Sequence, residues 1–318
     1  MYTTPQDQKQ RRPLVREKVD LAVTLGGDGT ILHASSLFSS TSLVPPILSF
    51  SMGTLGFLGE WKFHDYKRAF REVYMSGSTT HLPTSTIASA AETPDSTSWS
   101  SIRGQSLGPT RSARVLLRNR LKVGLFSPTG TRLPLDDRDG FIDADLHAMN
   151  DVIIHRGASP HLAHISVSVG GRFLTEAVAD GMIISTPTGS TAYSLSSGGS
   201  IIHPLVSSLL LTPICPRSLS FRPLVIPATT EVTLRMSERN RNDAMEVSID
   251  GRRRAEGVGV GMVIRVRGEE IKSDRGWGGG VPCVMRGTSG DGANGDEGWV
   301  GGLNSLLKFN YPFGDEGR

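Results

Sequence analysis

The chain has 318 residues, of which 37% are hydrophobic and 20% charged, enough for a packed core in one large domain or two ordinary ones. The formal net charge of +3 suits an anionic ligand but is too small to indicate nucleic-acid binding. Two distant cysteines, Cys215 and Cys283, predict no disulfide framework and no metal site, and so indicate a reducing compartment. Because no apolar run approaches the ~20 residues that cross a bilayer, we expect no membrane partner.

The first 75 residues alternate between strand and helix patterns. A buried strand is predicted over 19–25, an amphipathic helix over 30–38 and a second strand over 47–50. A glycine-interrupted loop over 52–60 leads to a second predicted helix over 65–75. This order is typical of a doubly wound layer, so we expect an N-terminal α/β, Rossmann-like domain.

The pattern of residues changes after residue 75. Ser and Thr supply 17 of the 37 residues in 76–112, which predicts a largely disordered insertion closing an α/β domain over 1–112. Short alternating runs then predict a mostly-β, β-sandwich domain over 113–275, with hairpin turns at Gly170-Gly171 and Asp250-Gly251. The predicted strands are 114–118, 121–125, 164–169, 172–175, 231–236, 246–249 and 262–267.

Both ends of the chain carry further expectations. A glycine-rich flexible loop is expected over 276–298, and an apolar segment over 299–318 is expected to pack back on the α/β domain. The 18 residues before Val19 contain no strand-helix unit, so we expect part of the first domain to lie outside this sequence. No secretory signal is evident in residues 1–12, and we expect a cytoplasmic location, with a mitochondrial one left open.

The run Gly26-Gly27-Asp28-Gly29-Thr30 stands between the first predicted strand and helix. Glycines let the backbone approach phosphate groups, and the amides of a helix N-terminus attract them. Asp28 is a carboxylate that can accept a proton from a substrate hydroxyl. Because a carboxylate beside a triphosphate needs an intervening cation, the run implies Mg²⁺ bound mainly by the phosphates of ATP. An ordinary helix N-cap at Asp28 is the alternative.

Two further motifs suit a polar ligand. In 180–199 a buried strand leads into a loop dense in hydroxyls and glycines, which fits ribose and phosphate groups, although Ser/Thr-rich turns are also common. Asn150-Asp151, at the start of a predicted strand, can hold a ribose diol but taken alone is more typical of a turn or cap. The chain has no Walker-type P-loop, and its eight histidines show no metal-ligand spacing.

In this order the three motifs resemble those of the NAD kinase family. The first is shared with diacylglycerol- and sphingosine-type lipid kinases and, as a close variant, with 6-phosphofructokinases. The run over 186–196, following Asn150-Asp151, is similar to NAD kinases only. Segments 25–38, 53–58 and 211–224 also resemble eukaryotic, fungal-like members, and the likeness covers roughly 19–75 and 113–275.

The resemblance implies a two-domain enzyme, with a phosphofructokinase-like α/β domain and a mostly-β domain that binds the dinucleotide. It implies transfer of the ATP γ-phosphate to the 2′-hydroxyl of the adenosine ribose of NAD, with NADH left open, and Asp28 as the catalytic proton acceptor. It also implies a homo-oligomer, dimer or tetramer, in which some site residues cross the interface. The phosphate-binding and dinucleotide-binding residues implied are Gly26, Gly27, Gly29, Thr30, His33, Asn150, Asp151, Asp180, Thr188, Thr191, Ala192, Tyr193, Ser194, Leu195, Ser196 and Arg252.

Two other functions remain open at this level. A lipid kinase would share the first motif but needs an exposed apolar pocket or a membrane-facing helix, and the sequence reveals neither. A catalytically weak, truncated relative would keep the dinucleotide site without assembling the ATP site. Product formation from Mg-ATP with NAD, NADH or a lipid separates the three.

Overall fold

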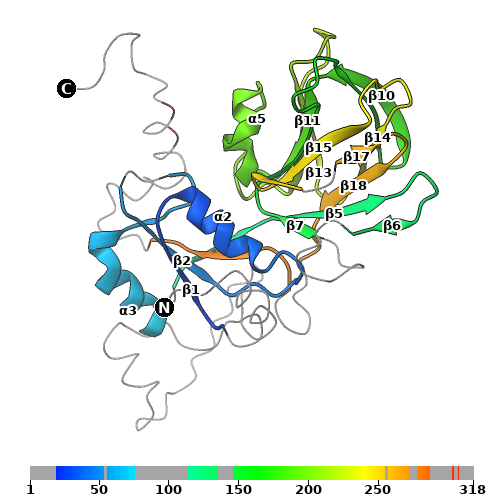
Figure 1. The fold of residues 1–318 in the computed structure, drawn as a ribbon. Coiled ribbons are helices and arrows are strands. Elements are labelled where there is room, and N and C mark those ends of the chain that lie inside the picture. The colour runs from blue at the N-terminus through cyan, green and yellow to red at the C-terminus, as the bar shows by residue number, and fades with distance from the viewer. Residues whose placement is uncertain are drawn as a thin grey trace, which may run out of the picture. The chain divides into compact units, whose positions relative to one another are not determined.

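The computed structural model describes residues 19–53, 56–75, 113–134, 146–254, 257–271 and 278–286, and in addition places Leu303 and Leu307 in helical conformation (Figure 1). These residues fall into two compact units. Of the described residues, the α/β unit contains 23–28, 48–53, 56–75, 113–116 and 283–286, whereas the β unit contains 19–22, 29–47 and those within 117–282. The predicted insertion over 76–112 and nearly all of the predicted C-terminal segment over 299–318 lie outside the described residues.

A five-stranded sheet forms the centre of the α/β unit. Its strand order is β1 (Ala22–Leu25), β2 (Ile47–Ser51), β19 (Val281–Val284) and β4 (Val115–Arg118), and β3 (Trp61–Lys62) pairs in parallel with β2. The helices of this unit are η1 (Phe63–Asp65) and α3 (Tyr66–Met75), and α2 (Asp28–Ser36) begins in this unit at Asp28 and continues in the β unit. The alternation of strand and helix predicted for the first 75 residues is thereby confirmed.

Strand β19 corrects part of the predicted glycine-rich loop over 276–298. Its residues Val281, Cys283 and Val284 are buried, because the strand lies between β2 and β4. The apolar run is only four residues long and is flanked by glycines, so composition masked it. Two strands of this sheet therefore come from beyond the predicted N-terminal α/β domain.

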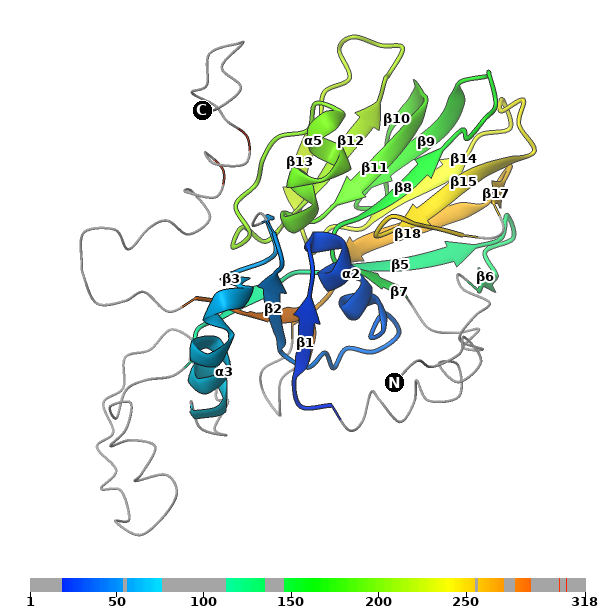
Figure 2. The same cartoon turned by 60° about the vertical axis from the view of Figure 1, so that its left-hand side comes forward.

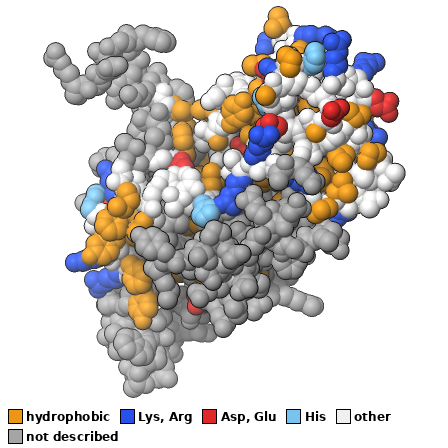
Figure 3. Space-filling view, viewed as in Figure 1, with side chains coloured by type: hydrophobic (Ala, Val, Ile, Leu, Met, Phe, Trp, Pro, Cys, Tyr) orange, Lys and Arg blue, Asp and Glu red, His pale blue; other side chains and the backbone are white. Residues whose placement is uncertain are grey.

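The predicted burial of the first strand is wrong. Val23 and Leu25 are 49% and 54% exposed whereas Thr24 is buried, because successive side chains of β1 point to opposite faces and the described residues cover only one of them. The apolar face predicted for α3 is likewise divided: Ala69 is fully buried, whereas Phe70 and Tyr74 are exposed. Figure 3 shows hydrophobic side chains gathered on the surface over α3, with Lys and Arg side chains beside them.

The β unit consists of two seven-stranded sheets, whose pairs are antiparallel (Figure 2). The first sheet contains, in order, β10 (Arg172–Ala179), β9 (Ala163–Val169), β14 (Val232–Met236), β18 (Val263–Gly268), β5 (Leu121–Phe126) and β6 (Arg132–Leu133), with β7 (Leu146–Ala148) also paired to β5. The second contains, in order, β13 (Leu224–Pro227), β12 (Ser208–Ile214), β11 (Gly181–Ser185), β8 (Asp151–His155), β15 (Ala244–Ile249) and β16 (Arg252–Arg253), with β17 (Val258–Gly259) paired to β15.

Alternate residues of both sheets meet in one core, as the predicted period of two requires. Ile165 and Val167 of one sheet and Ile154 and Ile184 of the other are fully buried members of this cluster. The predicted hairpin turns are confirmed by backbone angles: φ is 56° and 77° at Gly170 and Gly171, and 48° and 72° at Asp250 and Gly251.

A buried ion pair fixes the segment that follows α2. Arg120 is 1% exposed; it donates two hydrogen bonds of 2.7 Å to Glu269 and others to the carbonyl oxygens of Phe38 and Thr41. Burial, with the charge of Arg120, lowers the pKa of the neighbouring His147 to about 4. His147 is therefore neutral at physiological pH, and the Arg120–Glu269 pair anchors the end of α2 within the β unit.

Candidate active site

The glycine-rich run turns from β1 directly into α2. The amide of Gly26 donates a 2.9 Å hydrogen bond to the carbonyl of Phe50, which continues the strand pairing up to the first glycine. Asp28 is then the first residue of the helix. Both of its carboxylate oxygens accept backbone hydrogen bonds, at 2.9 Å from Phe57 and 3.1 Å from Leu58. These bonds orient the carboxylate from outside its own helix.

The glycines around Asp28 differ in whether the surrounding protein leaves room for a side chain. A Cβ atom at Gly56 would lie 2.2–2.6 Å from the carboxylate of Asp28, so the fold itself excludes a side chain there. A Cβ atom at Gly27 or Gly29 would meet no atom of the described residues within 4 Å apart from its neighbours along the chain, and φ at neither lies in the left-handed region. Packing therefore explains Gly56 but neither Gly27 nor Gly29.

In the β unit, the Asn150-Asp151 turn and the hydroxyl-rich loop are joined by Thr186. Its hydroxyl donates a 2.6 Å hydrogen bond to the carbonyl of Met149, and its amide donates one of 2.9 Å to the carbonyl of Asn150. A Cβ atom at Gly189 would lie 2.1 Å from the same Asn150 carbonyl oxygen. The two predicted motifs are thus packed backbone against backbone, because β8 and β11 pair with Asp151 opposite Ser185.

The amide side chain of Asn150 is notable within this cluster. Asn150 is 9% exposed, and its buried side-chain oxygen has no hydrogen-bond partner among the described residues. Buried polar atoms in folded proteins are nearly always paired. An unpaired acceptor at a predicted ribose-binding position fits a hydroxyl donor supplied by a ligand.

Asp250 belongs to this cluster, although the sequence suggested only a hairpin turn at this position. Its carboxylate accepts amide hydrogen bonds from Met149 at 2.8 Å, Asn150 at 2.6 Å and Asp151 at 3.2 Å. Its own amide donates a 3.0 Å bond to the carbonyl of Asp151. The positive φ of Asp250 is unusual for a residue other than glycine and marks the position in the structure. In the sequence, the Asp-Gly pair indicates only a turn.

Two carboxyl groups therefore lie close together at this turn. Burial, and secondly the charge of Asp250, raises the pKa of Asp151 to about 7. Desolvation also raises the pKa of Asp250, while its three backbone hydrogen bonds and the charge of Arg120 act in the opposite direction. At neutral pH the pair is thus poised to hold a proton.

Other predicted contacts are distributed unevenly. Arg252, two residues beyond Asp250, hydrogen-bonds the ring of His33 on α2, so these two predicted residues do meet. Ser194 is fully buried and its hydroxyl is bonded at 2.8 Å to Thr212 of β12. The Ser194 side chain therefore fastens helix α5 (Tyr193–Ser196), which follows η2 (Thr188–Thr191), to the outer face of its sheet.

Asp180 is the predicted contact that the structure separates from the rest. It precedes β11, whereas Thr186 and the hydroxyl-rich loop follow it. Five strand residues at ~3.3 Å each put these two ends on the order of 20 Å apart. Asp180 is instead paired at 2.6 Å with Arg156.

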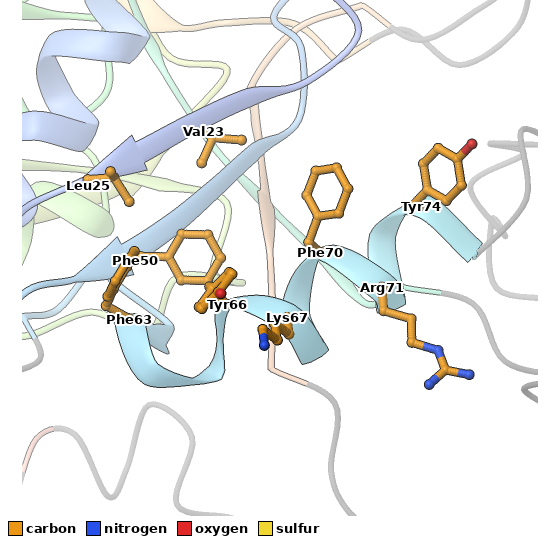
Figure 4. Close-up of a pocket in the computed structure, with 9 residues that line it drawn as sticks. All are labelled: Val23, Leu25, Phe50, Phe63, Tyr66, Lys67, Phe70, Arg71 and Tyr74. Atoms are coloured by element: carbon orange, nitrogen blue, oxygen red, sulfur yellow. The ribbon is translucent and has the colours of Figure 1, made fainter.

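The α/β unit also has an apolar hollow that the sequence did not reveal (Figure 4). It has a volume of about 590 Å³ and contains none of the predicted site residues. Its lining residues are Val23, Leu25, Phe50, Phe63, Tyr66, Lys67, Phe70, Arg71 and Tyr74. The α/β unit therefore does contain an exposed apolar hollow of the kind that a lipid kinase would need.

Two family models match the chain. The ATP-NAD kinase N-terminal domain matches residues 3–78, and the ATP-NAD kinase C-terminal domain matches residues 149–270. The crystal structure of yeast NADH kinase complexed with NADH is similar at a TM-score of 0.69 and 35% sequence identity, covering 98% of this chain and 70% of that one. The chain belongs to the NAD kinase family.

Two curated NAD kinase relatives illustrate the extent of the likeness. The mitochondrial NADH kinase of Schizosaccharomyces pombe is 40% identical over 303 residues, which is 95% of this chain and 62% of that protein. The mitochondrial NADH kinase of Saccharomyces cerevisiae is 39% identical over 255 residues, 79% of this chain and 49% of that protein. The chain therefore spans about half to two thirds of the length of these relatives.

Family membership agrees with an α/β part followed by a β part.

Among the described residues, no group of three or more His, Cys, Asp or Glu side chains could hold a metal ion. Within the same part of the chain, no helix is both long and apolar enough to cross a membrane.

Proposed function

We propose that the chain is an NAD kinase that transfers the γ-phosphate of ATP to the 2′-hydroxyl of the adenosine ribose of NAD or NADH, with Asp28 as the proton acceptor. The observation that carries the proposal is the carboxylate of Asp28 at the N-terminus of α2, held by two backbone amides of the 56–58 loop. Family membership supplies the reaction class, since both family models are those of ATP-NAD kinases.

The glycines of the run support phosphate binding. Because packing does not require glycine at positions 27 and 29, their lack of side chains is best accounted for by a ligand that approaches the backbone closely. Gly26 and Thr30 flank these positions, and the first amides of α2 provide partial positive charge. We assign the ATP phosphates to this turn.

Asp28 acts on the acceptor hydroxyl in this account. A carboxylate fixed by two backbone amides has little freedom to rotate, so a hydroxyl held against it meets a base in a defined orientation. Phosphoryl transfer requires little covalent chemistry from the protein, and most of the rate enhancement is expected from positioning and electrostatics.

Magnesium is expected to accompany ATP. Both oxygens of Asp28 already accept amide hydrogen bonds, which fits an ion held mainly by phosphate oxygens instead of by this carboxylate. When bound, the ion would neutralise the charge of the phosphates that face the carboxylate.

The β unit is assigned the dinucleotide. Asn150 offers a buried unpaired acceptor, Asp151 a carboxylate beside it, and Thr188 and Thr191 line the loop that Thr186 joins to them. The backbone of 192–196 continues this loop, and Arg252, hydrogen-bonded to the ring of His33, adds a cationic group for the pyrophosphate. Asp180, which lies far from this cluster in one chain, is proposed to reach a dinucleotide only across a subunit interface of a dimer or tetramer.

The assay is incubation of the purified chain with Mg-ATP and, in separate reactions, NAD, NADH or diacylglycerol. NADP or NADPH is expected from the first two and no phosphorylated lipid from the third. NAD binding without any product would favour the truncated dinucleotide-binding alternative, whereas lipid phosphorylation would favour the lipid kinase. Light scattering of the same sample measures the oligomer.

The names of the relatives suggest which dinucleotide is phosphorylated and in which compartment, and both points are proposals. Both curated relatives reported above are named mitochondrial NADH kinases. We therefore propose that NADH is accepted as well as NAD, and that the location is mitochondrial instead of cytoplasmic as the sequence suggested. Comparison of kcat/KM for the two acceptors, and fractionation of organelles, test these points.

A further inference from the structure

The Met149–Asp151 segment, which presents two predicted ligand contacts, is held from two sides by residues that are not themselves predicted contacts. On one side the carboxylate of Asp250 receives all three amides of the segment, over distances of 2.6–3.2 Å. On the other, Thr186 binds the carbonyl oxygens of Met149 and Asn150. Because these contacts supply hydrogen-bond partners for the backbone of the segment, the Asn150 side chain is not needed as a partner for these groups.

The local conformation of Asp250 is specific to this arrangement. Its φ of 48° lies in the left-handed region, which Asp and Asn adopt more readily than other residues with side chains. Only a carboxylate has two acceptor oxygens and no donor, so only Asp combines this backbone angle with acceptance of three amides. The hairpin turn accounts for the backbone angle but not for the three amide hydrogen bonds.

We propose that Asp250 is a positioning residue of the dinucleotide site: it fixes the Met149–Asp151 backbone so that the unpaired Asn150 side-chain oxygen is presented to the ribose of the bound dinucleotide. This inference rests on the proposed function, since it concerns the same site. Asp250 acts through the segment and not through the reacting atoms, so its loss should weaken dinucleotide binding much more than it slows phosphoryl transfer.

The test is the substitution Asp250→Asn, which keeps the volume and the tolerated backbone angle but turns one acceptor into a donor that faces the amide of Met149. The KM and the Kd for NAD are expected to rise about tenfold, with kcat changed less than about threefold. The KM for Mg-ATP should stay near its wild-type value. Glu176→Gln is the matched control, because Glu176 is also a carboxylate in the β unit but bonds His164 and Arg239.

A second variant and a second measurement guard against misfolding of Asp250→Asn. Thr186→Val removes the hydroxyl bond to Met149 with little change in shape, and it should also raise the Kd for NAD. In the wild-type protein without ligand, hydrogen exchange should show protected amides at Met149, Asn150 and Asp151, a readout that needs no variant.

The outcomes separate this inference from the proposed function. Wild-type protein that binds neither NAD nor NADH would overturn the proposed function and this role together. Wild-type binding that both Asp250→Asn and Thr186→Val leave within twofold would overturn the positioning role alone. Rapid exchange of the three amides in folded wild-type protein would do the same, as would an equal loss of NAD and Mg-ATP affinity in Asp250→Asn.

Discussion

The two units of this chain bury their apolar residues in different ways. In the first sheet of the β unit, strands such as β14 have one inner face, and residues such as Val123 and Leu234 from alternate positions are at most 1% exposed. In the α/β unit, the equally apolar strand β1 lies at the sheet edge, and Leu25 is 54% exposed. An alternating pattern thus specifies which side chains are buried, whereas a continuous apolar run specifies only that a strand forms.

In the proposed function, the proton acceptor Asp28 belongs to the α/β unit and most NAD contacts belong to the β unit. Asp28→Asn is the most severe test of this division. Turnover should fall by about 10²–10⁴-fold, because the proton acceptor is lost while the shape is kept. The Kd for NAD should stay within about threefold, since the proposed contacts with NAD lie mainly in the β unit. Steady-state kinetics and calorimetry measure the two quantities. Undiminished turnover would remove Asp28 from its role, and a parallel loss of NAD binding would contradict the division.

The contrast in burial predicts unequal effects of two leucine truncations. Leu234→Ala, in the sandwich core, should lower the free energy of unfolding by about 2–5 kcal/mol because it leaves a cavity. Leu25→Ala removes the same atoms from a half-exposed position and should cost below about 1 kcal/mol. Urea denaturation of both variants makes the comparison. Equal losses would show that β1 is covered in solution.

Glycines with and without a packing role provide a third comparison. Gly56→Ala forces a Cβ atom into the carboxylate of Asp28 and should lower kcat by about 10–100-fold through misplacement of the base. Gly59→Ala is the control, because its Cβ atom would meet only the Cβ of Ser51, at 4.0 Å. A Gly56→Ala variant with the kcat of the control would mean that the position of Asp28 is not held by the 56–58 loop.

The carboxyl pair of the β unit gives the smallest effect, a pH dependence of stability. The pKa of Asp151 is raised from 3.8 to about 7, so between these values the folded state binds more protons than the unfolded state. Asp151 should therefore lower the free energy of unfolding as pH rises from about 4 to about 7, by on the order of 2 kcal/mol, whereas His147, whose pKa is lowered from 6.5 to about 4, contributes in the opposite direction over much of the same interval. Asp250, whose pKa is also raised, acts in the same direction as Asp151, whereas the charge of Arg120 opposes it.

Denaturation midpoints at pH 5 and pH 8 measure this dependence. Asp151→Asn should gain more stability between these pH values than the wild-type protein, since the amide does not titrate and the contribution of His147 remains. An equal pH dependence in the two proteins would show that Asp151 ionises normally in the folded state.

The sequence predicted those features that depend on local pattern. Periodicity and glycine chemistry account for both hairpin turns, the strand-loop-helix around Asp28 and the predicted sandwich strands over 121–125, 164–169, 172–175, 231–236, 246–249 and 262–267. Strands β12 and β13 were not predicted, and the predicted strand over 114–118 is β4 of the five-stranded sheet. The sequence also did not predict strand β19, because a four-residue apolar run among glycines carries no period and is defined by its neighbours β2 and β4.

The site was predictable in part for a related reason. Asn150, Asp151 and the hydroxyl-rich loop stood out as polar residues at strand ends, and β8 and β11 do bring them together. Asp250 lies about 100 residues from its three amide partners, and only the pairing of β15 with β8 places it there. The buried Ser194 shows the opposite error, since a hydroxyl in a ligand-like loop can serve packing instead.

The most direct test of the central claim is phosphorus NMR of the product made by the wild-type chain from Mg-ATP and NAD. The account predicts ADP and one new phosphomonoester, on the 2′-oxygen of the adenosine ribose, formed by the wild-type protein and reduced by at least about 100-fold in Asp28→Asn. Release of inorganic phosphate without a new phosphomonoester, or a phosphate on any other oxygen of the dinucleotide, would contradict it.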